Sequence, residues 1–226
     1  MNQMISSISA AAVIHATETT AAVPRLSVGL ARQSTAEQMF RIGSRLKMAL
    51  KPSEQIIACT GVSQDDPSES FAVHAAMALA RLGHGPVLLV DANFHRRLDP
   101  KRLVSQSVGF ADLLTDESRL DGAVRCTDVE GLDVLTAGDT ASVVPAILSS
   151  ARMDQVIESF RSYRLVVMDV GAILDNSECQ VMAAKADVIV ATAVAGERSR
   201  RDVERLKAEI DLLRTSFLGV VLTGVK

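Results

Sequence analysis

The chain has 226 residues, of which 48% are hydrophobic, 23% are charged and 3% are aromatic. These values are typical of one α/β domain with an aliphatic core, and a net charge of −3 argues against the basic surface that nucleic-acid-binding proteins use. The three cysteines are far apart and form no C-x-x-C pair, so the sequence predicts neither a disulfide framework nor a zinc site.

Residues 1–35 are predicted to form a mobile leader, and residues 36–226 a single domain. The first 24 residues contain no Lys or Arg, and the apolar patch at 10–14 is too short for a signal-peptide core or a membrane span. No later run reaches 18 uninterrupted apolar residues. We therefore expect a cytoplasmic protein without a direct membrane span, whose association with the inner membrane comes through a partner.

Strand and helix signals alternate along the rest of the chain. Short runs rich in Val, Ile and Leu predict strands at 56–60, 87–91, 132–136, 165–169, 188–193 and 218–222. Runs with apolar residues on one face predict helices at 37–50, 68–82, 144–160 and 198–214, with shorter ones at 110–114 and 120–125. Right-handed crossovers place helices on both faces of such a sheet. The expected fold class is α/β, with a doubly wound, mainly parallel sheet flanked by helices on both faces.

Residues 59–70 join a predicted strand to a predicted helix, which is the setting of the phosphate-binding loop G-x-x-x-x-G-K-[ST]. Such a loop binds phosphate and Mg²⁺ through backbone N–H groups, the Lys and the hydroxyl. Here Ser68 stands where the Lys is expected and Glu69 where the hydroxyl is expected. The candidate nucleotide site is therefore a degenerate loop that comprises Asp65, Asp66, Ser68, Glu69 and Ser70.

The residues that replace the loop signature favour a helix that caps itself. Asp66 is a good N-cap, Pro67 suits the first helical position, and Glu69 falls three residues after the cap, as in a capping box. When carboxylates accept the N–H groups at the start of a helix, few free N–H donors remain there to bind an anion. Asp65 adds a further negative charge. The sequence thus predicts a loop that does not bind nucleotide in the usual way.

Two of the predicted strands end in an aspartate. Asp91 follows four apolar residues, and so does Asp169. The carboxyl ends of parallel strands are where α/β folds bind ligands, and aspartates at these positions hold Mg²⁺ directly or through water. The alternative is that each is a turn former or helix cap. With the loop nearby, the pair indicates an ancestral nucleotide site, with Asp91 and Asp169 as remnant acids and as the metal ligands if the site is active.

From about residue 37 to residue 225 the sequence resembles the cytoplasmic kinase domain of bacterial tyrosine autokinases of capsule and exopolysaccharide synthesis, which are P-loop NTPase-like relatives of the MinD/ParA group. The order and spacing of several stretches carry the resemblance: VLLVDA at 87–92, GFADLL at 109–114, GLDVLTAG at 131–138, PAIL at 145–148, SARM at 150–153, YRLVVMD at 163–169, ADVIV at 186–190 and LGVVLTGV at 218–225.

The resemblance implies roles for single positions. Asp91 matches the first acid of the family's second Walker motif, whereas Asn93 replaces the second acid and His95 replaces an Arg. Asp169 matches the Walker B acid, and Glu178 stands where the family tends to have an Asp. Phosphoryl transfer depends on positioning and charge neutralisation. Because two carboxylates remain without the Lys or the hydroxyl, we expect almost no phosphoryl transfer from this site.

The family phosphorylates a C-terminal tyrosine cluster, whereas the single tyrosine here, Tyr163, precedes a predicted strand and is expected to pack there. The family also has a helix with one Glu and two Arg that packs subunits into a ring. Glu37, Arg41 and Arg45 recur every four residues on a predicted helix and form an altered version of that interface. The alternative is a solvated face with weak ion pairs.

Two basic clusters, at 96–102 and at 197–205, could contact an acidic partner or lipid headgroups. Acids interleaved in the second cluster favour a solvated helix face instead.

These observations predict a degenerate tyrosine autokinase-like protein, a pseudokinase without cofactor, which acts as a regulatory or scaffold subunit in exopolysaccharide or capsule biosynthesis and export. Its expected partner is a membrane-anchored polysaccharide chain-length or export protein, and it could form a homo-oligomer. One alternative is an active protein-tyrosine kinase or ATPase that binds ATP and Mg²⁺ through a non-standard loop. Another is a MinD-like positioning protein, which usually has an amphipathic membrane helix.

Overall fold

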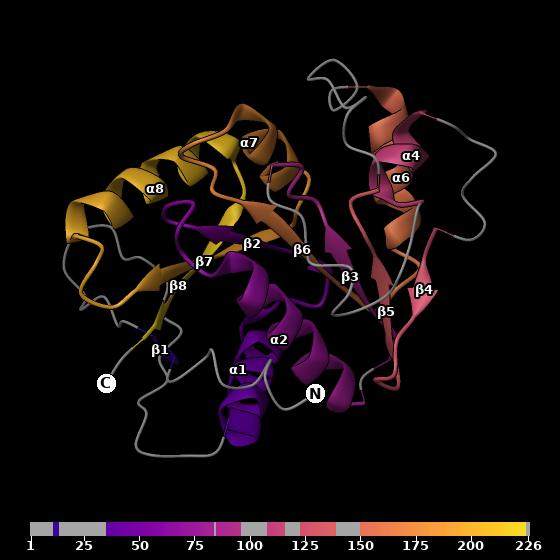
Figure 1. Cartoon of the computed structure of the whole chain (residues 1–226), viewed down its shortest axis with the longest axis horizontal. Coiled ribbons are helices and arrows are strands. Elements are labelled where there is room, and N and C mark those ends of the chain that lie inside the picture. Colours follow the sequence, from indigo (N-terminus) through magenta and orange to yellow (C-terminus); the bar gives the residue numbers. More distant parts are fainter. Residues whose placement is uncertain are drawn as a thin grey trace.

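The computed structural model describes residues 11–13, 35–83, 85–95, 108–115, 123–138 and 150–224, and the fold is reported for these ranges. A sheet of eight strands forms its centre, in the order β1-β8-β7-β2-β6-β3-β5-β4 (Figure 1). The strands are β1 (Ala11–Val13), β2 (Ile56–Gly61), β3 (Val87–Asp91), β4 (Arg125–Cys126), β5 (Leu132–Leu135), β6 (Leu165–Gly171), β7 (Val188–Val194) and β8 (Ser216–Thr223). The six strands from β8 to β5 in this order are parallel, whereas β1 and β4 are antiparallel edge strands.

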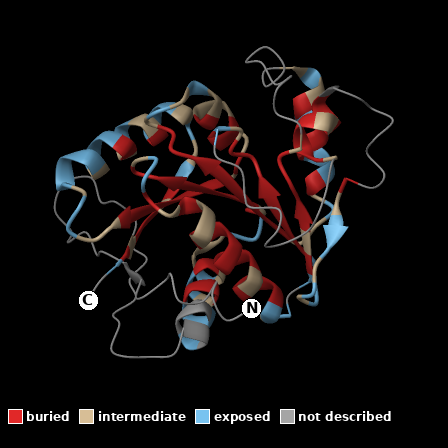
Figure 2. Ribbon diagram, in the orientation of Figure 1, coloured by how far each residue is buried: buried red, intermediate tan, exposed pale blue. Residues whose placement is uncertain are grey.

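Helices cover both faces of the sheet, which confirms the expected doubly wound α/β class. They are α1 (Thr35–Ala49), α2 (Ser68–Arg81), α4 (Phe110–Thr115), α6 (Ala151–Phe160), α7 (Ser177–Ala183) and α8 (Arg200–Leu213). Helices α1 and α2 pack on one face, whereas the other four helices contribute to a second apolar cluster on the opposite face. Figure 2 shows the strands almost wholly buried between these layers, with the outer sides of the helices exposed.

The alternation of side chains along the central strand β2 builds the two cores. Ile56 and Ala58 belong to the cluster with α6, α7 and α8, whereas Ile57 and Cys59 belong to the cluster with α1 and α2. All four residues are fully buried, as expected of a parallel strand covered on both sides. The long apolar runs of the sequence therefore reflect burial on two faces, and their C-terminal ends come together at one edge of the sheet.

Helix α1 approaches α2 closely because small residues meet at the contact. A Cβ atom added to Gly43 would lie 2.8 Å from the Cβ atom of Ala78, so glycine is required at this crossing. Ile42 and Leu46 on the inner side of α1 are buried, and Phe40, Arg41 and Met48 on its outer side are exposed. Helix α1 thus belongs to the domain, with one face left toward solvent.

Most predicted elements are found within one or two residues of their expected bounds. The helix predicted at 120–125 is wrong where it can be compared, because 123–124 form a turn and bend and Arg125 begins β4. The helix predicted at 144–160 is observed from Ala151, after an N-cap in which the Ser150 hydroxyl accepts from the Met153 N–H. Helix α7 and the edge strands β1 and β4 were not predicted.

Strand β1 is the part of the predicted leader 1–35 that the structure describes, apart from the first residue of α1, and it pairs with β8. The boundary between leader and domain remains a prediction. The basic cluster at 96–102 lies outside the described residues, as does the stretch 139–149 that contains the first part of the predicted helix 144–160. Within the described ranges, no helix combines the length and apolarity that crossing a membrane requires.

Asp187, just before β7, fixes the strand that leads to the phosphate-loop position. Its Oδ2 atom accepts the backbone N–H groups of Gln55 and Ile56, both at 2.8 Å. The Arg161 guanidinium after α6 donates to both carboxylate oxygens, at 3.2 and 2.9 Å. The hydrogen bonds from Arg161 and from these backbone groups hold the pKa of Asp187 below its ordinary value against the opposing effect of burial. One half-buried carboxylate therefore joins β2, β7 and the end of α6.

Replacing Asp187 with Asn should destabilise the domain by about 2–3 kcal/mol, because it removes the charge from several hydrogen bonds to one carboxylate. The measurement is the free energy of unfolding in urea. Asp211→Asn is the matched control, since Asp211 pairs with Lys207 on the exposed side of α8, and its loss should cost less than about 1 kcal/mol. Equal effects of the two substitutions would contradict the proposed role of Asp187.

Candidate functional site

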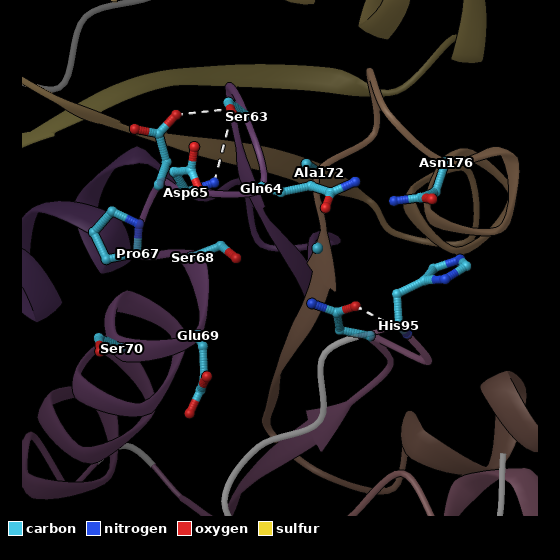
Figure 3. A pocket seen from close by; sticks show the side chains of 13 residues that line it. Ser63, Gln64, Asp65, Pro67, Ser68, Glu69, Ser70, His95, Ala172 and Asn176 are labelled. Carbon is cyan, nitrogen blue, oxygen red and sulfur yellow. Dashed lines mark hydrogen bonds between the residues drawn. The ribbon is translucent and has the colours of Figure 1, made fainter. Parts of the chain in front are cut away.

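A pocket of about 250 Å³ lies at the carboxyl ends of the parallel strands. The loop between β2 and α2, the segment after β3, the segment after β6 and the start of α7 enclose it (Figure 3). Its thirteen lining residues are Ser63, Gln64, Asp65, Asp66, Pro67, Ser68, Glu69, Ser70, Asn93, His95, Gly171, Ala172 and Asn176. The structure thus brings all five predicted loop residues to one site.

The carboxylate of Asp66 makes contacts that the sequence did not predict. Its Oδ2 atom accepts the backbone N–H of Ser63 at 2.9 Å and the Nε–H of Arg198 at 2.9 Å, and its Oδ1 atom accepts the backbone N–H of Val194 at 2.8 Å. The Asp66 side chain is fully buried. It therefore joins the loop to the end of β7 and to the segment before α8.

The predicted capping box at the start of α2 is wrong. Helix α2 begins at Ser68, its N-cap is Pro67, and no side chain caps its first turn. Asp66 is directed elsewhere because Arg198 and the N–H of Val194, far along the chain, together neutralise and satisfy its carboxylate. The charge of Asp66 is consequently paired, and it does not face the pocket as the repulsive charge that the sequence suggested.

Backbone donors of the loop are nevertheless occupied by carboxylates of the same chain. Besides the Ser63 N–H bound to Asp66, the Gln64 N–H donates to Oδ2 of Asp175 at 3.1 Å. In a phosphate-binding loop such N–H groups converge on the anion. Here two of them are directed to internal acceptors, so the loop differs from a phosphate-binding loop in its hydrogen bonding as well as in its sequence.

The two remnant acids lie toward the same edge of the sheet, as predicted, and the structure shows that their strands are neighbours. Asp91 at the end of β3 and Asp169 on β6 are register partners on adjacent parallel strands, and both are buried. Gly171, with a φ of 72°, follows at the floor of the pocket, and a Cβ atom there would lie 2.8 Å from the amide of Asn93. Glycine therefore permits the segment after β6 to pass directly against the end of β3.

Asp169 is the least satisfied carboxylate of the site. Its Oδ1 atom accepts the N–H of Gly171 at 3.3 Å, whereas its buried Oδ2 atom has no hydrogen-bond partner. The side chains of Ser68 and Asn93 lie close enough to favour its charge, but burial outweighs them and raises its pKa from 3.8 to about 6. Asp169 is not among the residues that line the pocket, so this oxygen is enclosed by the protein.

On the opposite side of the pocket, His95 meets a residue of α7. Its Nε2 atom lies 3.4 Å from Oε2 of Glu178, so the structure brings together two positions that the family resemblance had singled out separately. A hydrogen bond from the backbone of α7 holds the pKa of Glu178 below its ordinary value, with help from Ser177 and His95. Figure 3 shows the His95 ring near Asn176, across the pocket from Ser68.

Sequence reasoning missed three residues that shape the site. Asp175 and Asn176 lie on the segment before α7, an element too short to be predicted. Arg198 was assigned to a solvated basic face, but its side chain is only 18% exposed and reaches the loop. The sequence position of Arg198 could have indicated its role, because it follows a buried strand and precedes a helix. Such segments lie at the sheet edge where α/β folds bind ligands.

The predicted interface residues lie away from the pocket, because none of them is among its lining residues. Glu37 and Arg41 on α1 form an exposed i,i+4 ion pair at 3.9 Å, and Arg45 is also exposed. Tyr163 packs at the entrance to β6, as predicted, and its hydroxyl donates to Oδ2 of Asp133 at 2.8 Å. Burial raises the pKa of Tyr163 above its ordinary value.

Replacing Asp66 with Asn should lower the free energy of unfolding by roughly 3 kcal/mol, because breaking a buried ion pair leaves Arg198 uncompensated. Urea denaturation measures the effect. Asp65→Asn is the control, since the Asp65 side chain is 87% exposed and its charge should change stability by no more than about 0.5 kcal/mol. Similar stabilities of the two variants would show that Asp66 does not hold the loop.

Replacing Asp169 with Asn should stabilise the protein at neutral pH. Because the folded-state pKa lies above the unfolded value, ionising this group costs stability as the pH rises from 3.8 to about 6, and the full cost remains above that range. A shift of about two units corresponds to roughly 3 kcal/mol at about pH 7.5. The gain should shrink as the pH falls through this window and vanish near its lower end, which urea denaturation across pH can measure. A gain that does not change with pH would rule out this explanation.

No family model matches the chain. Among curated proteins, it is 25% identical over 170 residues to the tyrosine-protein kinase CpsD of Streptococcus pneumoniae, a match that covers 74% of each protein. It is 26% identical over 171 residues to the tyrosine-protein kinase YwqD of Bacillus subtilis, covering 75% of this chain and 70% of the relative.

Solved structures show the same fold. The kinase domain of the Escherichia coli tyrosine kinase ETK superposes with a TM-score of 0.77 at 22% identity, covering 85% of this chain and 76% of that structure. The septum site-determining protein MinD of Pyrococcus horikoshii superposes with a TM-score of 0.58 at 18% identity, covering 74% of this chain and 68% of that structure. The resemblance found in the sequence is therefore confirmed: over most of its length the chain is similar to bacterial tyrosine-protein kinases, and it has the α/β P-loop fold of their kinase domains.

Proposed function

We propose that this protein is a catalytically degenerate relative of the bacterial tyrosine kinases, which acts by binding rather than by phosphoryl transfer. Its role is that of a regulatory or scaffold subunit in exopolysaccharide or capsule biosynthesis and export. Similarity to tyrosine kinases over about three quarters of the chain supports the pathway, because the resembling family acts in capsule and exopolysaccharide synthesis.

The composition of the pocket is the observation that carries the proposal. None of the thirteen residues that line it in the described part of the chain is Lys or Arg, whereas Asp65 and Glu69 are carboxylates and the carboxylate of Asp66 is paired with Arg198. A transferring phosphoryl group needs cationic groups or metal ions to neutralise its charge. Arg198, a cation next to the loop among the described residues, is already bound to Asp66. The described part of the site therefore has no lining Lys or Arg for the charge neutralisation on which phosphoryl transfer depends.

An active kinase or ATPase is the second candidate, and one observation favours it. Asp91 and Asp169 remain adjacent in register at the end of the sheet, in the arrangement from which a Mg²⁺ ion is held in P-loop proteins. If ATP and Mg²⁺ bind here, these two acids are the expected metal ligands. Among the lining residues that the structure describes, His95 would then be the group that can carry a positive charge, although Glu178 lies beside it.

The outer face of α1 is the proposed contact surface. It carries Glu37, Arg41 and Arg45 together with two exposed apolar side chains, Phe40 at 54% and Met48 at 84% exposure. Mixed apolar and Arg-containing patches are typical of protein interfaces. We propose that this face binds either a second copy of the chain or a membrane-anchored chain-length or export protein, and that the protein resides in the cytoplasm at the inner membrane through that partner.

Calorimetric titration with ATP and Mg²⁺ tests the proposal. The wild-type protein should show no binding up to about 1 mM nucleotide, because the loop offers no cation to the phosphates. The Ser68→Lys, Glu69→Ser double variant restores the Lys and the hydroxyl of the phosphate loop. Binding by this variant alone would locate the defect in these two positions.

Glu69→Gln is the control, since it removes negative charge without adding a cation, and it should remain unable to bind. Binding by neither wild type nor double variant would extend the degeneracy to the rest of the pocket. Micromolar binding of ATP by the wild type would overturn the proposal and favour the kinase.

A further inference from the structure

The carboxyl end of β7 holds the Asp66 carboxylate, which anchors the loop at 63–70. Just beyond the end of β2, the Val62 N–H donates to the Thr192 carbonyl of β7 at 3.0 Å. Two residues later on β7, the Val194 N–H donates to Oδ1 of Asp66 at 2.8 Å. The Asp66 carboxylate thus continues the ladder of hydrogen bonds between β2 and β7, and the place of the loop depends on where Val194 lies.

Thr223, the last residue of β8, holds the residues on either side of Val194. Its hydroxyl donates to the Ala193 carbonyl at 3.3 Å, and its carbonyl accepts the Ala195 N–H at 2.8 Å. Val194 and Thr223 are also register partners on the parallel strands β7 and β8. The end of β7 is therefore bound to β8 on one side and to the Asp66 carboxylate on the other.

Strand β1 pairs with the same part of β8 from its outer side (Figure 1). The antiparallel register partners are Ala11 with Thr223, Ala12 with Leu222, and Val13 with Val221. On their inner side, the same three residues of β8 pair with 192–194 of β7. Three short strand segments therefore lie in succession between the N-terminal part of the chain and the carboxylate that anchors the loop.

A bulge separates this part of β8 from its beginning. The register with β7 shifts so that Ile189 opposes Phe217 whereas Val190 opposes Gly219, which has a φ of 137°. Bulges interrupt pairing at the edge of a sheet. Within the part of the chain that the structure describes, the outer side of 216–220 has no strand partner. Without β1, the last residues of β8 would form an unsupported strand end, and such ends open at little cost in free energy.

The pairing of β1 is itself easily lost. The strand has three residues, and residues 14–34 separate it from α1. Closing a long connection costs conformational entropy, which offsets part of the free energy that three residue pairs contribute. Loss of β1 leaves the six parallel strands paired with one another. The edge of β8 can therefore exist with or without β1 while the domain stays folded.

We propose that β1 is a removable brace of the pocket loop. While residues 11–13 pair with β8, they hold the end of β7 and with it the Asp66 anchor, and any contact that withdraws them loosens the loop at 63–70. The N-terminal segment in this way regulates the pocket without touching it. Such coupling is reciprocal, so loosening the Asp66 anchor also weakens the pairing of β1. The inference does not depend on whether the pocket takes a nucleotide.

Native-state hydrogen exchange of the full chain, followed by NMR spectroscopy, tests the coupling. The variant Ala11→Pro, Ala12→Pro removes two N–H donors, and one of them faces β8 because successive residues of a strand direct their N–H groups to opposite edges. The amides of Ser63 and Val194 should exchange at least about tenfold faster, because the strand end that holds them opens more often. The amides of β3, beyond β2 and β6 in the sheet, should change by no more than about twofold.

The matched control is Ala21→Pro, Ala22→Pro, which makes the same change in an identical Ala-Ala-Val tripeptide outside β1. It should leave all these exchange rates unchanged. The reciprocal variant Asp66→Asn should accelerate exchange at 221–223 by more than it accelerates exchange in β3.

Three results would overturn the inference. Unchanged exchange at Ser63 and Val194 in the variant at 11 and 12 would show that β1 is not coupled to the loop. Equal acceleration of these amides and of β3 would show that β1 contributes to the stability of the whole domain and does not act on the loop. An equal effect of the control variant would show that pairing of β1 with β8 is not the cause.

Discussion

The buried carboxylate of Asp66 is the interaction on which the rest of the site depends. It receives hydrogen bonds from the loop after β2, from the end of β7 and from Arg198 before α8, three segments that are distant in the chain. A buried charge is tolerated only when it is paired and hydrogen-bonded. The loop must therefore lie where these donors converge, and Arg198 is engaged by Asp66 rather than directed at a ligand.

Asp169 presents the opposite case within the same pocket. The strand register places it next to Asp91 and beneath Ser68, yet one of its oxygens has no partner. Buried titratable groups whose pKa is strongly perturbed concentrate at functional sites, although structural networks produce them too. The Asp66 carboxylate thus holds the loop in place, whereas burial of the Asp169 carboxylate opposes its ionisation and lowers the stability of the fold.

The sheet could be predicted closely because its central strands are buried on both faces. The run ending at Asp91 was predicted with its observed bounds, since an uninterrupted apolar stretch between turn signals has few other interpretations. Short elements gave no such signal. The helix prediction at 120–125 fails at Arg125, where β4 begins, because pairing of β4 with β5 overrides a weak local helix preference. Helix α7, with seven residues, was not predicted.

The sequence by itself determined the fold class, the missing lysine at position 68 and the presence of two aspartates toward the carboxyl ends of two strands, whereas the structure showed that these strands are neighbours. It could not determine the direction of the Asp66 carboxylate. Local rules favoured a cap on the following helix, whereas the structure directs the carboxylate to Arg198 and Val194, more than a hundred residues away. Only the tertiary structure decided this, because a salt bridge and a backbone hydrogen bond in a buried site outweigh a single helix cap.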